Sequence, residues 1–169
     1  MRTLVLGGIR SGKSGWAEQQ LAAQQVCYVA TGTTVFDDEF AARVSAHRDR
    51  RPPHWTTAET PDVATHLGEH SGATLVDDIG GWLVAALDRC GAWTAGTIDH
   101  EAERLIGAVR DFTGDLVLVS PEVGLTVVPA TASGRRFADE LGTLNQQLAA
   151  VCDRVVLVVA GQPLTIKES

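Results

Sequence analysis

Cysteine is scarce in this sequence, and its N-terminus lacks a long apolar run. The three cysteines, Cys27, Cys90 and Cys152, are odd in number and form no CxxC pair, which favours buried reduced thiols over disulfides or a zinc site. The apolar run at residues 3–6 is too short for a signal-peptide core or a membrane span. We therefore expect a cytoplasmic protein with no membrane segment.

Basic residues are also in deficit. The chain has 14 lysines and arginines against 21 aspartates and glutamates, a formal net charge of -7, so it has no general attraction for nucleic acid or anionic lipid. Its 44% hydrophobic and 21% charged residues are typical of a globular protein, and 169 residues can bury one core. We predict a single domain over residues 1–169 that binds no nucleic acid.

Short apolar segments alternate with longer amphipathic segments along the chain. Strand-like runs rich in Val, Leu and Ile lie at residues 3–6, 26–30, 74–76, 116–119 and 155–160. Segments with helical spacing lie at residues 13–24, 37–50, 62–70, 82–90, 98–112 and 135–151. This order predicts an α/β fold in which helices cover both faces of a mostly parallel sheet.

Residues 7–14 match the pattern GxxxxGK[ST]. They are Gly7, Gly8, Ile9, Arg10, Ser11, Gly12, Lys13 and Ser14. Backbone N–H groups of such a loop surround the phosphates of a nucleotide, with Lys13 near the β and γ phosphates and the Ser14 hydroxyl on Mg²⁺. The pattern here follows a predicted strand and precedes a predicted helix, the context that it requires. It favours a P-loop NTPase (RecA-like) architecture over a glycine turn without a ligand.

A phosphate loop of this kind also needs an acidic residue at the end of a neighbouring buried strand. Asp77 follows the apolar run at residues 73–76 and is the candidate for holding Mg²⁺. Asp78 could share that role or cap the next segment. A solvated loop carboxylate is the structural alternative for both residues.

His47 lies on the apolar face of the helix predicted over residues 37–50. A histidine in such a place is more often a packed core residue than a catalytic one. However, three arginines follow it at once, Arg48, Arg50 and Arg51. A neutral imidazole beside guanidinium groups can attack phosphorus, because these cations stabilise the charge that develops on the phosphoryl oxygens. A solvated helix end that favours cations is the alternative.

Five segments together resemble one known family nearly end to end. They are GGIRSGKS at 7–14, YVAT at 28–31, DDEFAARVSAHRDRRPPHWTTAE at 37–59, EVG with VP at 122–129, and LNQQLA at 144–149. The family is that of bifunctional adenosylcobinamide kinase / adenosylcobinamide-phosphate guanylyltransferase, which acts in assembly of the cobalamin nucleotide loop. The sequence departs from the family's pattern at Gly80 and Gly81. It also has Ala138 where the family commonly has an arginine, and Arg135 or Arg136 is the candidate to replace that arginine.

The resemblance implies two reactions on a corrinoid. ATP or GTP first phosphorylates the aminopropanol hydroxyl of adenosylcobinamide. GTP then guanylylates a histidine, and the GMP passes to the phosphorylated corrinoid to give adenosylcobinamide-GDP. His47 matches the guanylylated histidine, and Lys13 is the other catalytic residue. The resemblance further implies a homo-oligomer, and nucleotide contacts from Thr31, Gly32, Thr33, Arg48, Asp49, Arg50, Arg51, Glu59 and Asp77.

Two other functions are compatible with the phosphate loop. The first is a simple small-molecule kinase that uses the loop and Asp77, with His47 in a structural role. The second is a GTP-dependent switch that signals by loop movement. The sequence speaks against the switch, because it contains no NKxD pattern for reading guanine.

Overall fold

The computed structural model describes residues 1–32 and 52–169. In this part of the chain, a seven-stranded sheet has the order β3-β2-β4-β5-β1-β6-β7. The strands are β1 (Arg2–Gly7), β2 (Val26–Ala30), β3 (Thr56–Glu59), β4 (Ala73–Asp77), β5 (Leu116–Pro121), β6 (Arg154–Val159) and β7 (Gln162–Glu168). All neighbouring strands pair in parallel except β6 and β7. The predicted mostly parallel sheet is confirmed.

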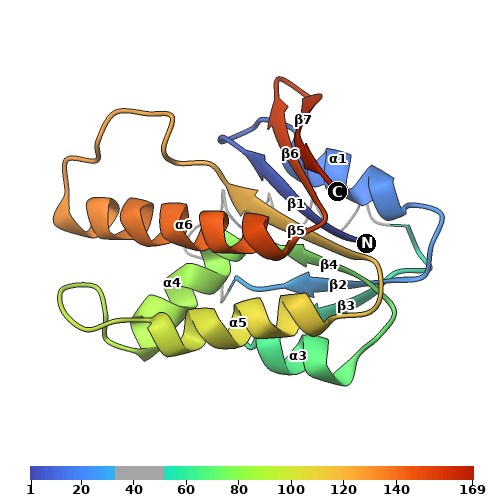
Figure 1. The fold of residues 1–169 in the computed structure, drawn as a ribbon, viewed down its shortest axis with the longest axis horizontal. Coiled ribbons are helices and arrows are strands. Elements are labelled where there is room, and N and C mark those ends of the chain that lie inside the picture. The colour runs from blue at the N-terminus through green and yellow to red at the C-terminus, as the bar shows by residue number, and fades with distance from the viewer. Residues whose placement is uncertain (33–51) are drawn as a thin grey trace.

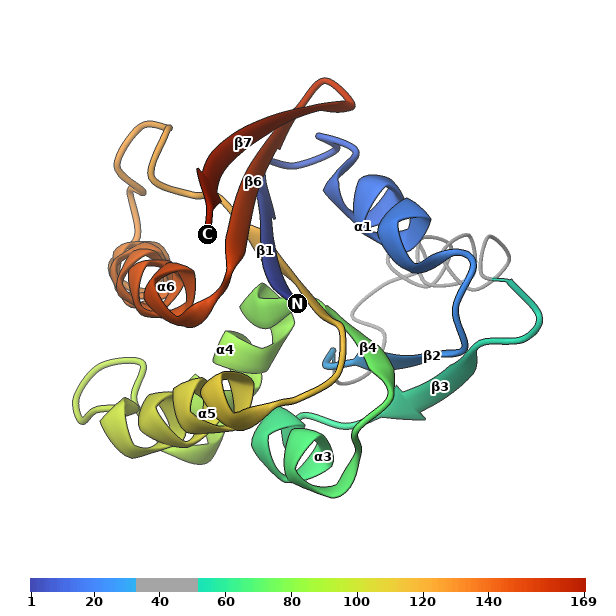
Figure 2. The same ribbon diagram turned by 45° about the vertical axis from the view of Figure 1, so that its right-hand side comes forward.

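Helices cover both faces of the sheet (Figures 1 and 2). They are α1 (Lys13–Leu21), α3 (Val63–Glu69), α4 (Ile79–Arg89), α5 (Asp99–Asp111) and α6 (Ala132–Val151). Figure 2 shows α1 on one face and the other four labelled helices on the opposite face. None of the described helices combines the length and the apolar character needed to cross a membrane.

Two apolar clusters fill the space between the sheet and these helices. The larger one joins buried residues of the central strands to α3, α4, α5 and α6, for example Leu118, Leu83 and Leu144. The smaller one joins α1, through Ala17 and Leu21, to the other face of the same strands. Strands buried on both faces explain why the sequence shows continuous apolar runs and not alternation.

Three details of the elements differ from the sequence prediction. Helix α4 begins at Ile79 and not at residue 82, because the Asp78 side chain caps it by accepting from the Gly81 N–H. Helix α6 begins at Ala132, where Thr131 is the cap. Strand β7 was not predicted, since Pro163 and the mixed polarity of Gln162–Glu168 are typical of an edge strand and not of a buried one. The helix predicted over 37–50 lies outside the described residues.

Parallel pairing brings the carboxyl ends of β1, β2, β4 and β5 to one edge of the sheet. The registers place Gly7 opposite Pro121, Ala30 opposite Asp77, and Asp77 opposite Val119. In open sheets of this kind, ligands bind beyond the carboxyl ends of the strands. This edge is therefore where the predicted site residues are expected to meet.

The opposite edge is tied together by an ion pair between Arg2 and Asp153. The Asp153 carboxylate accepts hydrogen bonds from the Arg2 backbone N–H at 2.7 Å and from its guanidinium at 2.7 and 3.3 Å. These bonds lower the pKa of Asp153 from 3.8 to about 2. The pair thus fixes the start of β6 beside the start of β1.

We predict that Asp153→Asn lowers the free energy of unfolding by about 1–2 kcal/mol at neutral pH, because charge-assisted hydrogen bonds are lost. The pKa of Asp153 is depressed in the folded protein, so the stabilisation is complete above pH 3.8 and is lost as the pH falls toward 2. Urea unfolding between pH 7 and pH 3 should show the gap between wild type and variant narrowing. The exposed Asp139→Asn serves as control, and an equal gap at every pH would contradict the prediction.

Candidate active site

The phosphate loop connects the end of β1 to the start of α1 in a compact turn. The Ser11 N–H donates to the Gly8 carbonyl at 3.3 Å, and the Lys13 N–H approaches the Ser11 hydroxyl at 3.4 Å. The Ser11 carbonyl accepts from the N–H of Gly161 at 2.8 Å. The turn between β6 and β7 therefore holds the phosphate loop through a backbone hydrogen bond.

The two glycines of the GxxxxGK pattern have steric reasons to be glycine. A Cβ on Gly7 would collide with the Ser11 hydroxyl and lie 2.9 Å from the Val158 carbonyl. Gly12 has φ +91°, and a Cβ there would lie 3.1 Å from the Cα of Gly161. Gly8, at a variable position of the pattern, would meet nothing within 4 Å. The backbone thus requires the glycines that the pattern fixes.

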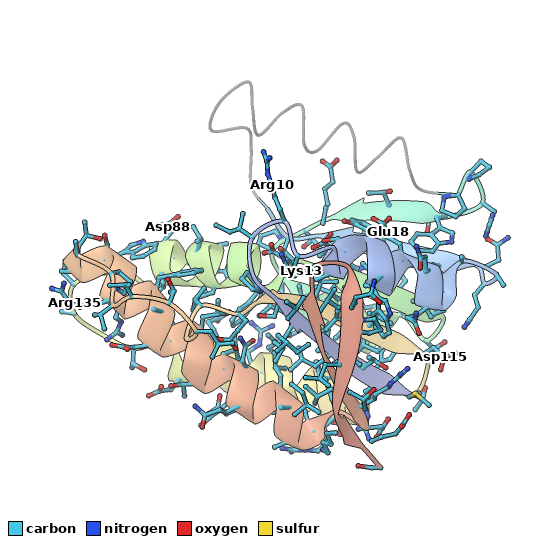
Figure 3. The ribbon with its side chains drawn as sticks, turned by 90° about the horizontal axis from the view of Figure 1, so that it is seen from above. Arg10, Lys13, Glu18, Asp88, Asp115 and Arg135 are labelled. Carbon is cyan, nitrogen blue, oxygen red and sulfur yellow. The ribbon has the colours of Figure 1, made fainter. Side chains whose placement is uncertain are left out.

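Helix α1 directs its N-terminus at the mouth of this loop. It begins at Lys13, has no acidic residue in its first turn, and its N-cap residue, Gly12, provides no side-chain cap. Unpaired N–H groups at a helix start attract anions. Figure 3 shows Lys13 at the start of α1 and Arg10 pointing outward from the loop. The Lys13 amine lies 3.5 Å from the Gly8 carbonyl, so the positive charge of Lys13 is next to the backbone of the loop.

Asp77 ends β4 at the same edge of the sheet. Its side chain is on the α1 face, the face to which Leu75, two residues earlier, contributes. The carboxylate accepts a hydrogen bond of 2.6 Å from the hydroxyl of Tyr28 on β2. One difference from the expectation concerns the strand order: β5 lies between β1 and β4, so Asp77 is on the next strand but one from the loop.

Asp78 adopts the capping role that the sequence left open. Its Oδ1 accepts the Gly81 N–H at 2.5 Å at the start of α4. Burial, and then the charge of Asp77, raise the pKa of Asp78 to about 6, while the cap hydrogen bonds and the charge of Lys13 oppose this rise. Gly80 of α4 packs against Pro121, and Pro121 is paired with Gly7 of the phosphate loop, so the loop and the start of α4 lie close to each other.

The glycines that depart from the family's pattern lie at tight contacts. A Cβ on Gly80 would come 2.9 Å from the Pro121 ring, and one on Gly81 would come 3.0 Å from the Thr31 hydroxyl. That hydroxyl donates to the Asp78 carbonyl at 2.5 Å. Gly80 and Gly81 therefore let α4 pack against the ends of β5 and β2.

Most of the described candidates gather at this edge. The structure brings together the phosphate loop, Thr31, Gly32 and Asp77, and it places the exposed Glu59 at the end of β3, opposite Ala30. Thr31 is 1% exposed. The other candidates, Thr33, His47, Arg48, Asp49, Arg50 and Arg51, lie outside the described residues. Their nucleotide contacts stay predictions.

Sequence reasoning missed a buried polar pair that supports the loop. Asn145 of α6 accepts from the Ser120 hydroxyl at 2.6 Å and donates to the Pro121 carbonyl at 3.1 Å. Both partners end β5, and the next residue, Glu122, donates its N–H to the Gly7 carbonyl at 3.0 Å. The sequence does hold a sign of this role, because Asn145 is a polar residue between Leu144 and Leu148 on the apolar face of a helix.

Comparison with known proteins is consistent with this arrangement. A family model described as cobinamide kinase / cobinamide phosphate guanyltransferase matches residues 3–166. The chain belongs to this family. It is 42% identical to the bifunctional adenosylcobalamin biosynthesis protein CobP of Pseudomonas aeruginosa over 99% of this chain and 98% of the relative. It is 40% identical to CobU of Salmonella typhimurium, a protein of the same description, over 99% of this chain and all of the relative.

The family's fold is shared with more distant proteins. A prototypical ATPase from the type III secretion system of pathogenic bacteria superposes with a TM-score of 0.56 at 11% identity, over 92% of this chain and 50% of that one. At this identity the likeness concerns the fold alone. It supports the predicted P-loop NTPase architecture.

We predict that Gly12→Ala weakens nucleotide binding by about tenfold or more. An alanine in the left-handed region costs about 1–2 kcal/mol, and its Cβ would also press on Gly161, so the loop must move. Titration with a fluorescent GTP analogue and Mg²⁺ measures the effect. Gly15→Ala in the first turn of α1, where a Cβ meets nothing within 4 Å, is the control. Equal affinity of the two variants would contradict the prediction.

Proposed function

We propose that this protein phosphorylates adenosylcobinamide with ATP or GTP and then transfers GMP from GTP, through His47, to the resulting phosphate. One observation carries the proposal: the phosphate loop, Asp77 and Asp78 lie at one edge of the sheet in a chain that matches the kinase and guanyltransferase family over residues 3–166. Such an edge binds a nucleoside triphosphate, and the family supplies the corrinoid acceptor.

In the first transfer the loop holds the triphosphate. The backbone N–H groups of residues 8–14 and the start of α1 bind the phosphate oxygens, and the Lys13 amine offsets charge near the transferred group. The acceptor hydroxyl attacks the γ phosphorus, and the bond to the nucleoside diphosphate breaks. The hydroxyl gives its proton to a carboxylate at this edge of the sheet, and Asp77 and Asp78 are the candidates.

The residues at this edge suit Mg²⁺. Magnesium prefers oxygen ligands and usually binds through one or two protein groups together with phosphates and water. The Ser14 hydroxyl and the Asp77 carboxylate are such groups. When bound, the ion would screen the charge of the phosphates.

In the second transfer the His47 imidazole attacks the α phosphorus of GTP. A nitrogen–phosphorus bond forms and the bond to pyrophosphate breaks. The phosphate oxygen of the corrinoid then attacks the same phosphorus, and the imidazole is released. Arg48, Arg50 and Arg51 are the candidates for stabilising the charge of these steps. The segment that carries His47 follows Gly32 in the chain, and Gly32 lies at this edge of the sheet. A Cβ built on Gly81, at the start of α4, would come 3.5 Å from the Gly32 Cα.

The proposal includes the setting of the enzyme. We expect a single domain over residues 1–169, assembled as a homo-oligomer in the cytoplasm. Support for one domain comes from a single family model that spans residues 3–166 and from relatives that are covered almost completely.

A simple P-loop kinase is the alternative, and labelled GTP distinguishes it from the bifunctional enzyme. We predict that GTP labelled at the α phosphorus leaves a covalent, acid-labile and base-stable label on the wild-type protein. His47→Ala should abolish the label and the second transfer, while it changes phosphorylation of the corrinoid only slightly, because the first transfer as proposed does not use the imidazole.

His54→Ala is the matched control, since His54 is an exposed histidine whose ring contacts the Gln24 carbonyl. It should keep the label. Phosphorylation of the corrinoid by a wild-type protein that takes no label would establish the simple kinase. A label that persists in His47→Ala would place the guanylylation on another residue.

A further inference from the structure

The chain has a single tyrosine, and its hydroxyl lies at the active-site edge. Tyr28 is 2% exposed, and its phenol donates a hydrogen bond of 2.6 Å to Oδ2 of Asp77. We propose that Tyr28 is a positioning residue, which holds the Asp77 carboxylate in the orientation that binds Mg²⁺ with the nucleotide. The inference rests on the magnesium site proposed above.

The sheet register explains how the phenol reaches this carboxylate. Strands β2 and β4 are parallel neighbours, with Tyr28 opposite Leu75 and Ala30 opposite Asp77. Residues two apart on a strand share a face, and a diagonal neighbour on the next strand is within reach of an aromatic side chain. Tyr28 therefore approaches Asp77 from the interior of the sheet, along the face that α1 covers.

Packing fixes the phenol ring. Tyr28 belongs to the smaller apolar cluster, together with Leu75 and with Ala17 and Leu21 of α1. A buried ring with two side-chain torsions has few alternative positions. The helix that presents Lys13 and Ser14 thus packs in the same cluster as the residue that orients Asp77.

The Asp77 carboxylate lies at the end of its strand, with Oδ2 bonded to the Tyr28 hydroxyl. Asp77 is only partly buried, and beside it the carboxylate of Asp78 is already bonded to the Gly81 N–H. The bond from Tyr28 selects one orientation of the Asp77 carboxylate before any ligand arrives. Partners of this kind behind a metal-binding group typically change metal affinity by about 10–100-fold when removed.

Tyr28→Phe tests this role, with Thr74→Val as the matched control. Thr74 is fully buried on the same strand as Asp77, and its hydroxyl donates to the Gly72 carbonyl, so its loss removes a buried hydroxyl without touching Asp77. We expect Tyr28→Phe to raise the Mg²⁺ concentration needed for half-maximal binding of a fluorescent GTP analogue by about tenfold. Nucleotide binding without metal should be unchanged, and Thr74→Val should behave as wild type.

A second measurement leaves the tyrosine in place. Since Tyr28 is the only tyrosine, incorporation of 3-fluorotyrosine gives one ¹⁹F resonance. Mn²⁺ with GTP should broaden this resonance, and Mn²⁺ without nucleotide should broaden it far less. An unbroadened resonance would overturn the proposal, as would a Tyr28→Phe protein with the Mg²⁺ dependence of wild type.

These outcomes are separable from failure of the proposed function. Both measurements follow the metal and the nucleotide, so a missing label on His47 would leave the role of Tyr28 standing. A wild-type protein that binds GTP with no dependence on Mg²⁺ would overturn the magnesium site and the role of Tyr28 together.

Discussion

The parallel pairing of β1 with β5 and of β5 with β4 is the constraint on which the site depends. It brings Gly7, Pro121 and Asp77 to one edge of the sheet. The proposed site uses both the loop and this carboxylate, so it depends on both pairings. The start of α1 and the cap of α4 both follow strands that end at this edge.

Charges of both signs lie at the described part of this edge. Asp77 and Asp78 are adjacent carboxyl groups, Lys13 begins α1, and burial raises the pKa of Asp78 to about 6. A triphosphate would add several negative charges to this arrangement. The proposed Mg²⁺ would offset this repulsion between the phosphates and the carboxylates.

Short sequence patterns were enough to predict the phosphate loop and the aspartate that ends β4. The phosphate loop was readable because its glycines are set by local backbone geometry, and Asp77 because it ends an apolar run. The place of β5 between β1 and β4 was not readable, since strand order depends on pairings between distant segments. Tyr28 and Asn145 were missed for the same reason: their partners, Asp77 and Ser120, are far along the chain, and only the sheet brings them together.

The contact between Ser11 and Gly161 also has a consequence for folding during synthesis. Ser11 is synthesised 150 residues before Gly161, which lies in the turn between β6 and β7. Contacts between such distant segments form late. The loop therefore lacks this supporting hydrogen bond until Gly161 has been made, and a nascent chain that stalls before β7 would expose a phosphate loop without it.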